Sequence, residues 1–241
     1  MDNKFSIITV TYNSSETVEQ TIKSVLGQTY VNFEYILVDG ASTDGTVDII
    51  KRYAKEDSRI RYISEPDNGI YDAMNKGIKM ATGDTIALLN SDDYYETDAL
   101  VHIVKYLPQK KYYVVYGMIR MLKNEKEEMV ILCSHNSIPE RMIMHPACFV
   151  SSAVYEKYQY DLKYKSAADY DLFLRLYQDH NVSFIPVYEV IVNYRMGGMS
   201  SSLISSLETN EIRYKYGYIS KMQRDIGNFG AKVKRCLLLR D

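Results

Sequence analysis

The chain has 241 residues, of which 46% are hydrophobic and 25% charged, and its formal net charge is −2. These proportions are typical of a globular protein and argue against general disorder. Because nucleic-acid-binding domains normally carry a basic excess, the charge balance also argues against a nucleic-acid partner. The length fits one large domain followed by a tail.

Cysteine usage and the N-terminus predict a cytoplasmic protein. Cys133, Cys148 and Cys236 are widely separated and form no CxxC pair, which argues against a disulfide framework and a zinc site. Asp2 and Lys4 stand where a signal peptide would need a positive stretch followed by a long apolar one. No run approaches the ~18 apolar residues of a membrane span, so we expect neither secretion nor a spanning helix.

The first sixty residues predict two strand–helix units. Residues 5–10, FSIITV, form an apolar, β-branched run typical of a buried parallel strand. Asn13 and Glu16 resemble a capping box, and the apolar residues after them recur at helical spacing. A second strand over residues 35–38 and a second helical face beyond residue 45 repeat the pattern.

Two further strands extend this alternation. Residues 61–63 form the third strand, residues 70–81 an amphipathic helix, and residues 85–89 the fourth strand. Such alternation implies right-handed crossovers and a mostly parallel sheet covered on both faces. Polar loops then gather at the carboxyl ends of the strands, the edge where sheets of this kind bind ligands.

The second half of the chain has a different pattern. Strands at 112–116 and 129–132 flank a polar turn with no helix between them. A helix is expected to begin near Asp169, and another strand covers 182–187. We therefore expect an α/β fold whose sheet is mixed but mainly parallel.

Residues 206–241 are expected to form a C-terminal tail. From residue 213 onward the acids are only Asp225 and Asp241, and apolar residues recur at roughly helical intervals. This pattern fits a basic amphipathic helix on an anionic membrane surface. A helix packed on the domain with a solvated outer face explains it equally well. The basic residues are Arg213, Lys215, Lys221, Arg224, Lys232, Lys234, Arg235 and Arg240.

The stretch Asn90-Ser91-Asp92-Asp93 directly follows the fourth strand and places two carboxylates side by side. Like charges there repel each other unless a cation or hydrogen-bond donors compensate. Mg²⁺ and Mn²⁺ prefer oxygen ligands and are commonly shared between carboxylates and a substrate diphosphate. The alternative is that the acids complement the dipole of a helix near Asp98, and these residues alone leave both interpretations open.

Tyr12 and Asp39 follow two other strands, so three polar loops are expected to share one edge of the sheet. Tyr12 offers an aromatic face for a nucleobase, and Asp39 offers an acceptor for a base N–H. Lys76, on the helix opened by Gly69, either places its ammonium near a diphosphate or lies on a solvated helix face.

Four motifs in this order and spacing resemble those of family 2 glycosyltransferases. The likeness is specific over residues 5–95, weaker to about residue 200 and absent in the tail. The stretch from Ser64 to Gly77, SEPDNGIYDAMNKG, is similar to a bacterial subgroup associated with O-antigen and capsule assembly. The motifs are Thr9-Val10-Thr11-Tyr12-Asn13, Val38-Asp39-Gly40-Ala41-Ser42-Thr43-Asp44-Gly45-Thr46, Asn68-Gly69 with Asn75-Lys76-Gly77, and Leu89-Asn90-Ser91-Asp92-Asp93.

This resemblance implies a GT-A fold, a Rossmann-like domain over residues 1–205. Its nucleotide-binding half is expected over 1–100 and its acceptor and catalytic half over 101–205. It further implies Mn²⁺ or Mg²⁺ held by Asp92 and Asp93. The residues expected to bind the nucleotide sugar are Thr11, Tyr12, Asn13, Asp39, Gly40, Ser42, Asn68, Gly69, Lys76, Ser91 and Asp92.

The family's general base lies in an acidic pair that opens a later helix. The matching stretch here is Ala167-Ala168-Asp169-Tyr170-Asp171-Leu172. Asp169 takes the second position of the pair, and Ala168 replaces the first acid. Asp171 is a second candidate, although at i+2 on a helix it faces another direction. Otherwise Asp169 is a charge that complements the helix N-terminus.

Two departures from the family concern the donor sugar and phosphate. Many relatives carry a late histidine that helps to hold metal or phosphate, but the matching stretch 194–200, YRMGGMS, has none. Arg195 or the Ser200 and Ser201 hydroxyls are expected to serve the diphosphate instead. His145 matches a subgroup position near the donor sugar or acceptor. As a lone histidine it is equally well explained as a structural residue.

The expected activity is inverting transfer of a sugar from a nucleotide-diphosphate donor, best guessed as a UDP-sugar, to an acceptor hydroxyl. By resemblance the acceptor is a lipid-linked saccharide of surface polysaccharide synthesis, met at the inner membrane face. A sugar nucleotidyltransferase would need an early glycine-rich, basic loop, which residues 11–15 lack. A catalytically silent nucleotide-sugar-binding subunit is the other alternative, suggested only by Ala168.

Overall fold

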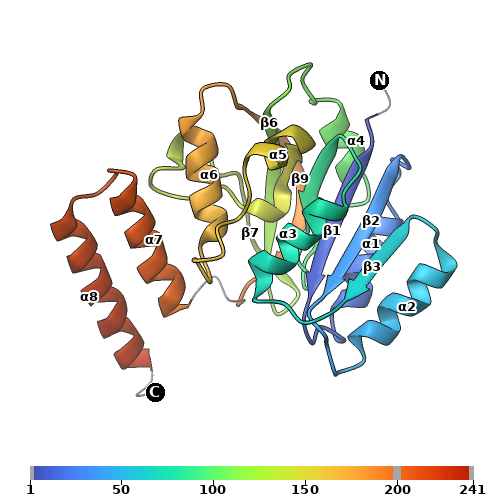
Figure 1. The fold of residues 1–241 in the computed structure, drawn as a ribbon, viewed down its shortest axis with the longest axis horizontal. Coiled ribbons are helices and arrows are strands. Elements are labelled where there is room, and N and C mark those ends of the chain that lie inside the picture. The colour runs from blue at the N-terminus through green and yellow to red at the C-terminus, as the bar shows by residue number, and fades with distance from the viewer. Residues whose placement is uncertain (1–2, 198–201, 239–241) are drawn as a thin grey trace.

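A computed structural model describes residues 3–197 and 202–238. It contains a nine-stranded sheet in the order β3-β2-β1-β4-β8-β6-β9-β5, with β7 paired to β6 (Figure 1). The strands are β1 Phe5–Thr11, β2 Phe33–Asp39, β3 Ile60–Ser64, β4 Thr85–Leu88, β5 Tyr94–Tyr95, β6 Tyr113–Lys123, β7 Lys126–Ile131, β8 Cys148–Ser151 and β9 Ser183–Arg195. The helices are α1 Val18–Leu26, α2 Thr46–Glu56, α3 Ile70–Met80, α4 Ala99–Val104, α5 Ser152–Lys157, α6 Ala168–Gln178, α7 Leu203–Lys215 and α8 Lys221–Leu238.

The first half is the parallel part of the sheet. β1 pairs in parallel with β2 and β4, and β2 pairs in parallel with β3. Helices cover both faces, so alternate residues of β1 enter different cores. Ile8 packs with residues of α3 and α6, whereas Ile7 packs with residues of α1, α2 and α4. The predicted α/β class with a mixed, mainly parallel sheet is confirmed.

The second half adds the antiparallel pairs. β8 runs antiparallel between β4 and β6, and β9 runs parallel to β6. The two predicted strands around a polar turn are observed as β6 and β7, joined by Asn124 and Glu125, which both have positive φ. The strand predicted at 182–187 continues to Arg195, and β8 had not been predicted.

The predicted capping box at Asn13 and Glu16 is wrong. Helix α1 begins at Val18, with Thr17 as its N-cap. Asn13 instead has φ 49° and accepts a hydrogen bond from the backbone N–H of Thr43 through its side chain. Its amide therefore joins the loops after β1 and β2 and caps no helix.

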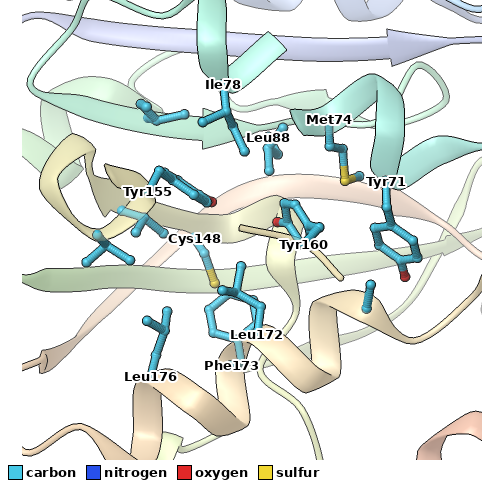
Figure 2. Close-up of a cluster of buried hydrophobic side chains, with 14 of the residues drawn as sticks. Tyr71, Met74, Ile78, Leu88, Cys148, Tyr155, Tyr160, Leu172, Phe173 and Leu176 are labelled. Carbon is cyan, nitrogen blue, oxygen red and sulfur yellow. The ribbon is translucent and has the colours of Figure 1, made fainter. Parts of the chain in front are cut away.

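The core beneath α3, α5 and α6 is rich in aromatic side chains. Figure 2 shows Tyr71 and Met74 of α3 above Leu172 and Phe173 of α6, with Tyr160 between the two helices. The Tyr71 and Tyr160 rings stack with centroids 5.4 Å apart. Apolar packing on this scale fixes the start of α6 relative to α3.

Helices α7 and α8 form a hairpin at the side of the molecule remote from β3 (Figure 1). Ile212 of α7 is fully buried in the same core as α6, whereas α8 packs on α7 and is the outermost element. The expected boundary between residues 205 and 206 lies inside α7. Among the residues described, none of the helices has the length and apolarity needed to cross a bilayer.

Candidate functional site

Three loops meet at the carboxyl ends of β1, β2 and β4, as the strand order requires. The backbone N–H of Asn13 donates to Ser42 Oγ at 2.8 Å, which joins the first loop to the second. The hydroxyls of Ser14 and Ser91 lie 2.8 Å apart and join the first loop to the acidic one. Asn13, Ser42 and Ser91 therefore lie at one edge and hold its loops together.

Tyr12 presents an open aromatic face at this edge. Its side chain is 67% exposed, which is unusual for a large ring beside a fully buried strand. A Cβ at Gly40 would lie 2.6 Å from Asp67 Oδ2 and 3.3 Å from Tyr12 Cδ2, so a larger residue there would have to displace the Asp67 carboxylate. The geometry leaves the ring free to stack on a planar ligand.

Asp39 is fully buried at the end of β2. Its carboxylate accepts hydrogen bonds from the hydroxyls of Thr11, Ser42 and Ser64 and from the backbone N–H of Ser42. A carboxylate has about four lone-pair sites, so these donors occupy it. In this arrangement Asp39 organises the loops, with Thr11 and Ser42 as its donors.

Lys76 reaches the loop that follows β3. Its ammonium lies 2.8 Å from Glu65 Oε1 and donates to the carbonyl of Pro66 at 2.9 Å. The hydrogen bond to Glu65 raises the pKa of Lys76. Gly69, at φ 110°, and Asn68 lie in the same loop, where their backbone N–H groups donate to Asp67 and Asp72. The ammonium is thus held near the loops.

The two carboxylates of the acidic motif have different environments. Asp93 is fully buried and accepts hydrogen bonds from Asn90 Nδ2 and the backbone N–H of Arg195, both at 3.0 Å. Burial, with the Asp92 charge second, raises the pKa of Asp93 to about 8. Asp92 is only partly buried, and within residues 3–197 and 202–238 its carboxylate has no hydrogen-bond donor.

The donor set around Asp92 fits a metal that is shared with a substrate. No cluster of three or more His, Cys, Asp or Glu side chains suited to a metal ion occurs among the described residues. Mg²⁺ and similar ions are commonly bound through one or two carboxylates together with substrate phosphates and water. Asp92 supplies such a carboxylate, whereas Asp93 would first have to leave its buried partners.

Arg195 holds the acidic loop from β9. Its guanidinium pairs with Glu125, donates to the carbonyl of Asp92 and to Gln20, and lies 5.2 Å from the Tyr94 ring centroid. The arginine therefore lies at the site, but most of its donors are already engaged by protein atoms. Ser200 and Ser201, the other residues expected at the diphosphate, lie outside the described residues.

Asp169 lies in the first turn of α6 and is 13% exposed. Its Oδ1 accepts hydrogen bonds from Tyr71 Oη and from the backbone N–H of Tyr170, both at 2.9 Å. Burial first, and the Asp169 charge second, raise the pKa of Tyr71, so its phenol remains a donor. The carboxylate is held in place without losing its contact with solvent.

His145 joins Asp169 to the acidic loop. Its Nδ1 lies 3.3 Å from Asp169 Oδ2, and its Nε2 lies 3.3 Å from Asn90 Oδ1. The structure thus brings Asp169, His145 and the loop of Asp92 into one site, although they are distant in the sequence.

Asp171 faces away from this site. It is 1% exposed, and its carboxylate accepts hydrogen bonds from Arg175, Lys215 and Tyr216. These partners are on α6 and at the end of α7, so Asp171 anchors α7 and is not placed beside the loops.

Sequence reasoning did not find two residues that support Asp169. Tyr71 was read only as part of an amphipathic helix. Glu208 of α7 accepts hydrogen bonds from the backbone N–H groups of residues 165–167, directly before α6. No sequence signal marks either residue, because both contacts join segments far apart in the chain.

Solved structures resemble this fold. TarS of S. aureus in complex with UDP-GlcNAc matches with a TM-score of 0.70 and 19% identity, over 93% of this chain and 70% of that one. A mannosyltransferase of Pyrobaculum calidifontis in complex with GDP-Man and Mn²⁺ matches with a TM-score of 0.68 and 18% identity, over 91% and 65% of the two chains. Identity this low supports the fold alone, which is of the GT-A type.

Sequence comparison identifies the family. A PGL/p-HBAD biosynthesis glycosyltransferase of Mycobacterium bovis is 30% identical over 83% of this chain and 80% of its own length. The putative teichuronic acid biosynthesis glycosyltransferase TuaG of Bacillus subtilis is 39% identical over 44% of this chain and 42% of its own length. The model of the family described as Glycosyl transferase family 2 matches residues 6–178, so the chain belongs to this family of glycosyltransferases.

Proposed function

We propose that the protein transfers a sugar from a UDP-sugar to an acceptor hydroxyl with inversion at the anomeric carbon. One observation carries the proposal: Asp169, a partly exposed carboxylate, contacts the acidic loop through His145. A general base and a diphosphate site must lie on opposite sides of one sugar for direct displacement. This contact supports such an arrangement.

The proposed reaction is a single displacement. Asp169 takes the proton of the acceptor hydroxyl, and the acceptor oxygen bonds to the anomeric carbon. The bond from that carbon to the diphosphate oxygen breaks, and the nucleoside diphosphate leaves with the electron pair. Mn²⁺ or Mg²⁺ bound through Asp92 would neutralise charge on the leaving diphosphate. Lys76 adds positive charge on the same side once it exchanges Glu65 for phosphate.

The loops after β1 and β2 are proposed to bind the nucleoside. Tyr12 stacks on the base, and Asp39 accepts from a base N–H when the hydroxyl of Ser64 gives way. Asn13, Gly40 and Ser42 shape this loop pair, and Asn68 and Gly69 close its other side. A uridine base is preferred by analogy with TarS, whose structure was solved with UDP and with UDP-GlcNAc.

The acceptor is proposed to be a saccharide, carried on a lipid, in the synthesis of a surface polysaccharide such as O-antigen or capsule. Similar proteins are named for teichuronic acid biosynthesis, for PGL/p-HBAD biosynthesis and as a chondroitin synthase. We further propose a cytoplasmic protein that meets this acceptor at the inner face of the membrane.

Helix α8 is the proposed membrane contact. Met222, Ile226, Phe229 and Val233 are 69%, 63%, 70% and 41% exposed and recur at helical spacing, so they form one apolar stripe. At 100° per residue, Lys221 and Lys232 fall along one flank of it together with Asp225, which pairs with Arg224. An apolar stripe with two lysines along its flank, where the one aspartate is already paired within the chain, suits an anionic bilayer.

Several basic residues of the tail form ion pairs within the protein or are partly buried, so fewer positive charges are available to contact a membrane. Lys215 pairs with Asp171, Arg224 pairs with Glu211 and Asp225, and Arg213 is partly buried. The membrane contact is therefore proposed for α8, with α7 as part of the catalytic unit.

Nucleotide release from a panel of UDP- and GDP-sugars, with Mn²⁺ or EDTA, tests the proposal. Slow transfer to water replaces the unknown acceptor, and NMR reads the anomer of the released sugar as it forms. We expect release from one UDP-sugar, dependent on metal, with the opposite anomeric configuration from the donor. Asp92→Asn should abolish the metal-dependent release. Retention of configuration would overturn the mechanism, and donor binding without release under any condition would favour a binding subunit.

A further inference from the structure

The carboxylate of Asp169 is held by groups from three parts of the chain. Tyr71 of α3 and the N–H of Tyr170 donate to Oδ1, and His145 lies 3.3 Å from Oδ2 through Nδ1. The His145 and Asp169 side chains are 15% and 13% exposed, so water competes little for the contact. Such shielding strengthens a hydrogen bond to a carboxylate.

The other side of the imidazole is also fixed. Asn90 donates through Nδ2 to Asp93 Oδ2 at 3.0 Å, which turns Asn90 Oδ1 toward His145 Nε2 at 3.3 Å. Asn90 opens the acidic loop, whose partly exposed carboxylate is Asp92. The imidazole therefore bridges the proposed base and the proposed metal loop with one ring nitrogen on each.

Both ring nitrogens of His145 face oxygen atoms that can only accept hydrogen bonds. The ionised carboxylate of Asp169 and the amide oxygen of Asn90 can only accept, so both contacts are hydrogen bonds when His145 carries a proton on Nδ1 and a proton on Nε2. Tyr71 and Tyr170 fill the lone pairs of Oδ1, and His145 takes one of the two on Oδ2. The remaining lone pair on Oδ2 is then the place where an acceptor hydroxyl can deliver its proton.

We propose that His145 is a positioning residue for the base. Its Nδ1–H orients Asp169 so that the free lone pair of Oδ2 faces the acceptor, and its Nε2 sets this direction relative to the acidic loop. Ala168 next to the base is fully buried and offers no polar support, so this support comes from across the fold. The inference rests on the proposed function, in which Asp169 deprotonates the acceptor.

The kinetic test compares His145→Ala with wild type and with His180→Ala, which removes an exposed histidine just after α6. The rate is measured with the UDP-sugar from which wild type releases UDP fastest. The affinity is measured with UDP in the presence of Mn²⁺. We expect His145→Ala to lower kcat by about 10–100-fold while UDP affinity stays within about twofold, because misplacement of a reacting group costs rate and not binding. Added imidazole should restore part of the rate in His145→Ala and none in Asp169→Asn. An unchanged kcat, or an equal loss of UDP affinity, would overturn the inference.

A spectroscopic test keeps this inference separate from the proposed function. Long-range ¹H–¹⁵N spectra of the imidazole should place a proton on Nδ1 of His145 in wild type. In Asp169→Ala the acceptor at Nδ1 is gone while Asn90 Oδ1 remains, so the ring should keep its proton on Nε2 and lose the one on Nδ1. A wild-type ring without a proton on Nδ1 would contradict the positioning role even if nucleotide release behaves as proposed. If no donor in the panel releases its nucleotide, the proposed function is refuted. The spectrum still tests whether His145 donates to Asp169.

Discussion

Glu208 on α7 accepts a hydrogen bond from the backbone N–H of Ala167, the residue just before α6, at 3.0 Å. The same carboxylate accepts from the N–H groups of Lys165 and Ser166 at 2.7 and 2.8 Å. The amino end of α6 has unsatisfied N–H groups and a positive dipole, which a carboxylate complements. Helix α7 thereby holds the helix turn that carries Asp169.

Removal of this carboxylate should loosen the turn and slow the reaction. In Glu208→Ala three N–H groups lose their acceptor, and an unmade hydrogen bond of this kind costs about 1–3 kcal/mol. We expect a lower melting temperature together with slower nucleotide release, both measured against Glu211→Ala, whose carboxylate is exposed on the same helix. Equal melting temperatures for the two variants would show that Glu208 does not support α6.

Tyr12 should contribute to donor affinity and little to stability. Its ring is 67% exposed, and stacking of a base on an aromatic ring is worth about 1–3 kcal/mol. Tyr12→Ala is therefore expected to weaken UDP binding by about fivefold or more, whereas Tyr12→Phe keeps most of the affinity. Isothermal titration with UDP and Mn²⁺ measures this.

The matched control is Tyr106→Ala, since Tyr106 is exposed beyond α4, before β6 and at the opposite edge of the sheet. Equal UDP affinity of Tyr12→Ala and Tyr106→Ala would exclude the stacking role.

His135 should make stability depend on pH. Burial lowers the pKa of His135 from its usual 6.5, and the Tyr116 hydroxyl, which accepts from the His135 backbone N–H, lies 2.8 Å from Nδ1, where it can donate to the neutral ring. The unfolded chain then binds a proton before the folded one, so the free energy of unfolding falls as the pH drops below 6.5 toward the lowered folded value. Melting curves of wild type and His135→Gln should show a wild-type advantage at pH 8 that shrinks toward pH 5. An advantage independent of pH would contradict the neutral ring.

The stripe on α8 should bind anionic vesicles. Burying a phenylalanine side chain is worth about 1.5–3 kcal/mol, so Phe229→Asn should lower the partition onto phosphatidylglycerol vesicles by about tenfold or more. Met129→Asn, which changes an exposed apolar residue on β7, should leave it unchanged. Sedimentation with vesicles measures both. Equal sedimentation of Phe229→Asn and wild type with the vesicles would contradict the proposed membrane contact. Helix α8 would then be a helix packed on α7 with a solvated outer face.

The parallel half could be predicted because its signals are local. The apolar run at 5–10 predicts a strand, and the turn residues after residue 38 predict a loop, without reference to the rest of the chain. β8 is only four residues long and is defined by pairing with β4 and β6, so no local pattern marks it. Asn13 was misread for a similar reason, because its partner Thr43 lies in another loop.

The motif residues were predictable as a set, but their geometry was not. The sequence made both Asp92 and Asp93 candidate metal ligands, whereas the backbone turns Asp93 into the core and leaves Asp92 partly exposed. Asp169 and His145 come together only because α6 packs over the sheet beside the acidic loop. Contacts of this kind depend on tertiary packing, which spacing along the chain does not encode.

Nucleotide release by Asp169→Asn, measured together with UDP affinity in Mn²⁺, tests the central claim most directly. Asp161→Asn serves as the control because its carboxylate is partly exposed and pairs with Lys163. Loss of a general base typically costs about 10²–10⁴-fold, so release should fall by that factor while UDP affinity stays near the wild-type value. Release by Asp169→Asn at the rate of wild type and of Asp161→Asn would contradict the assignment of Asp169 as the base.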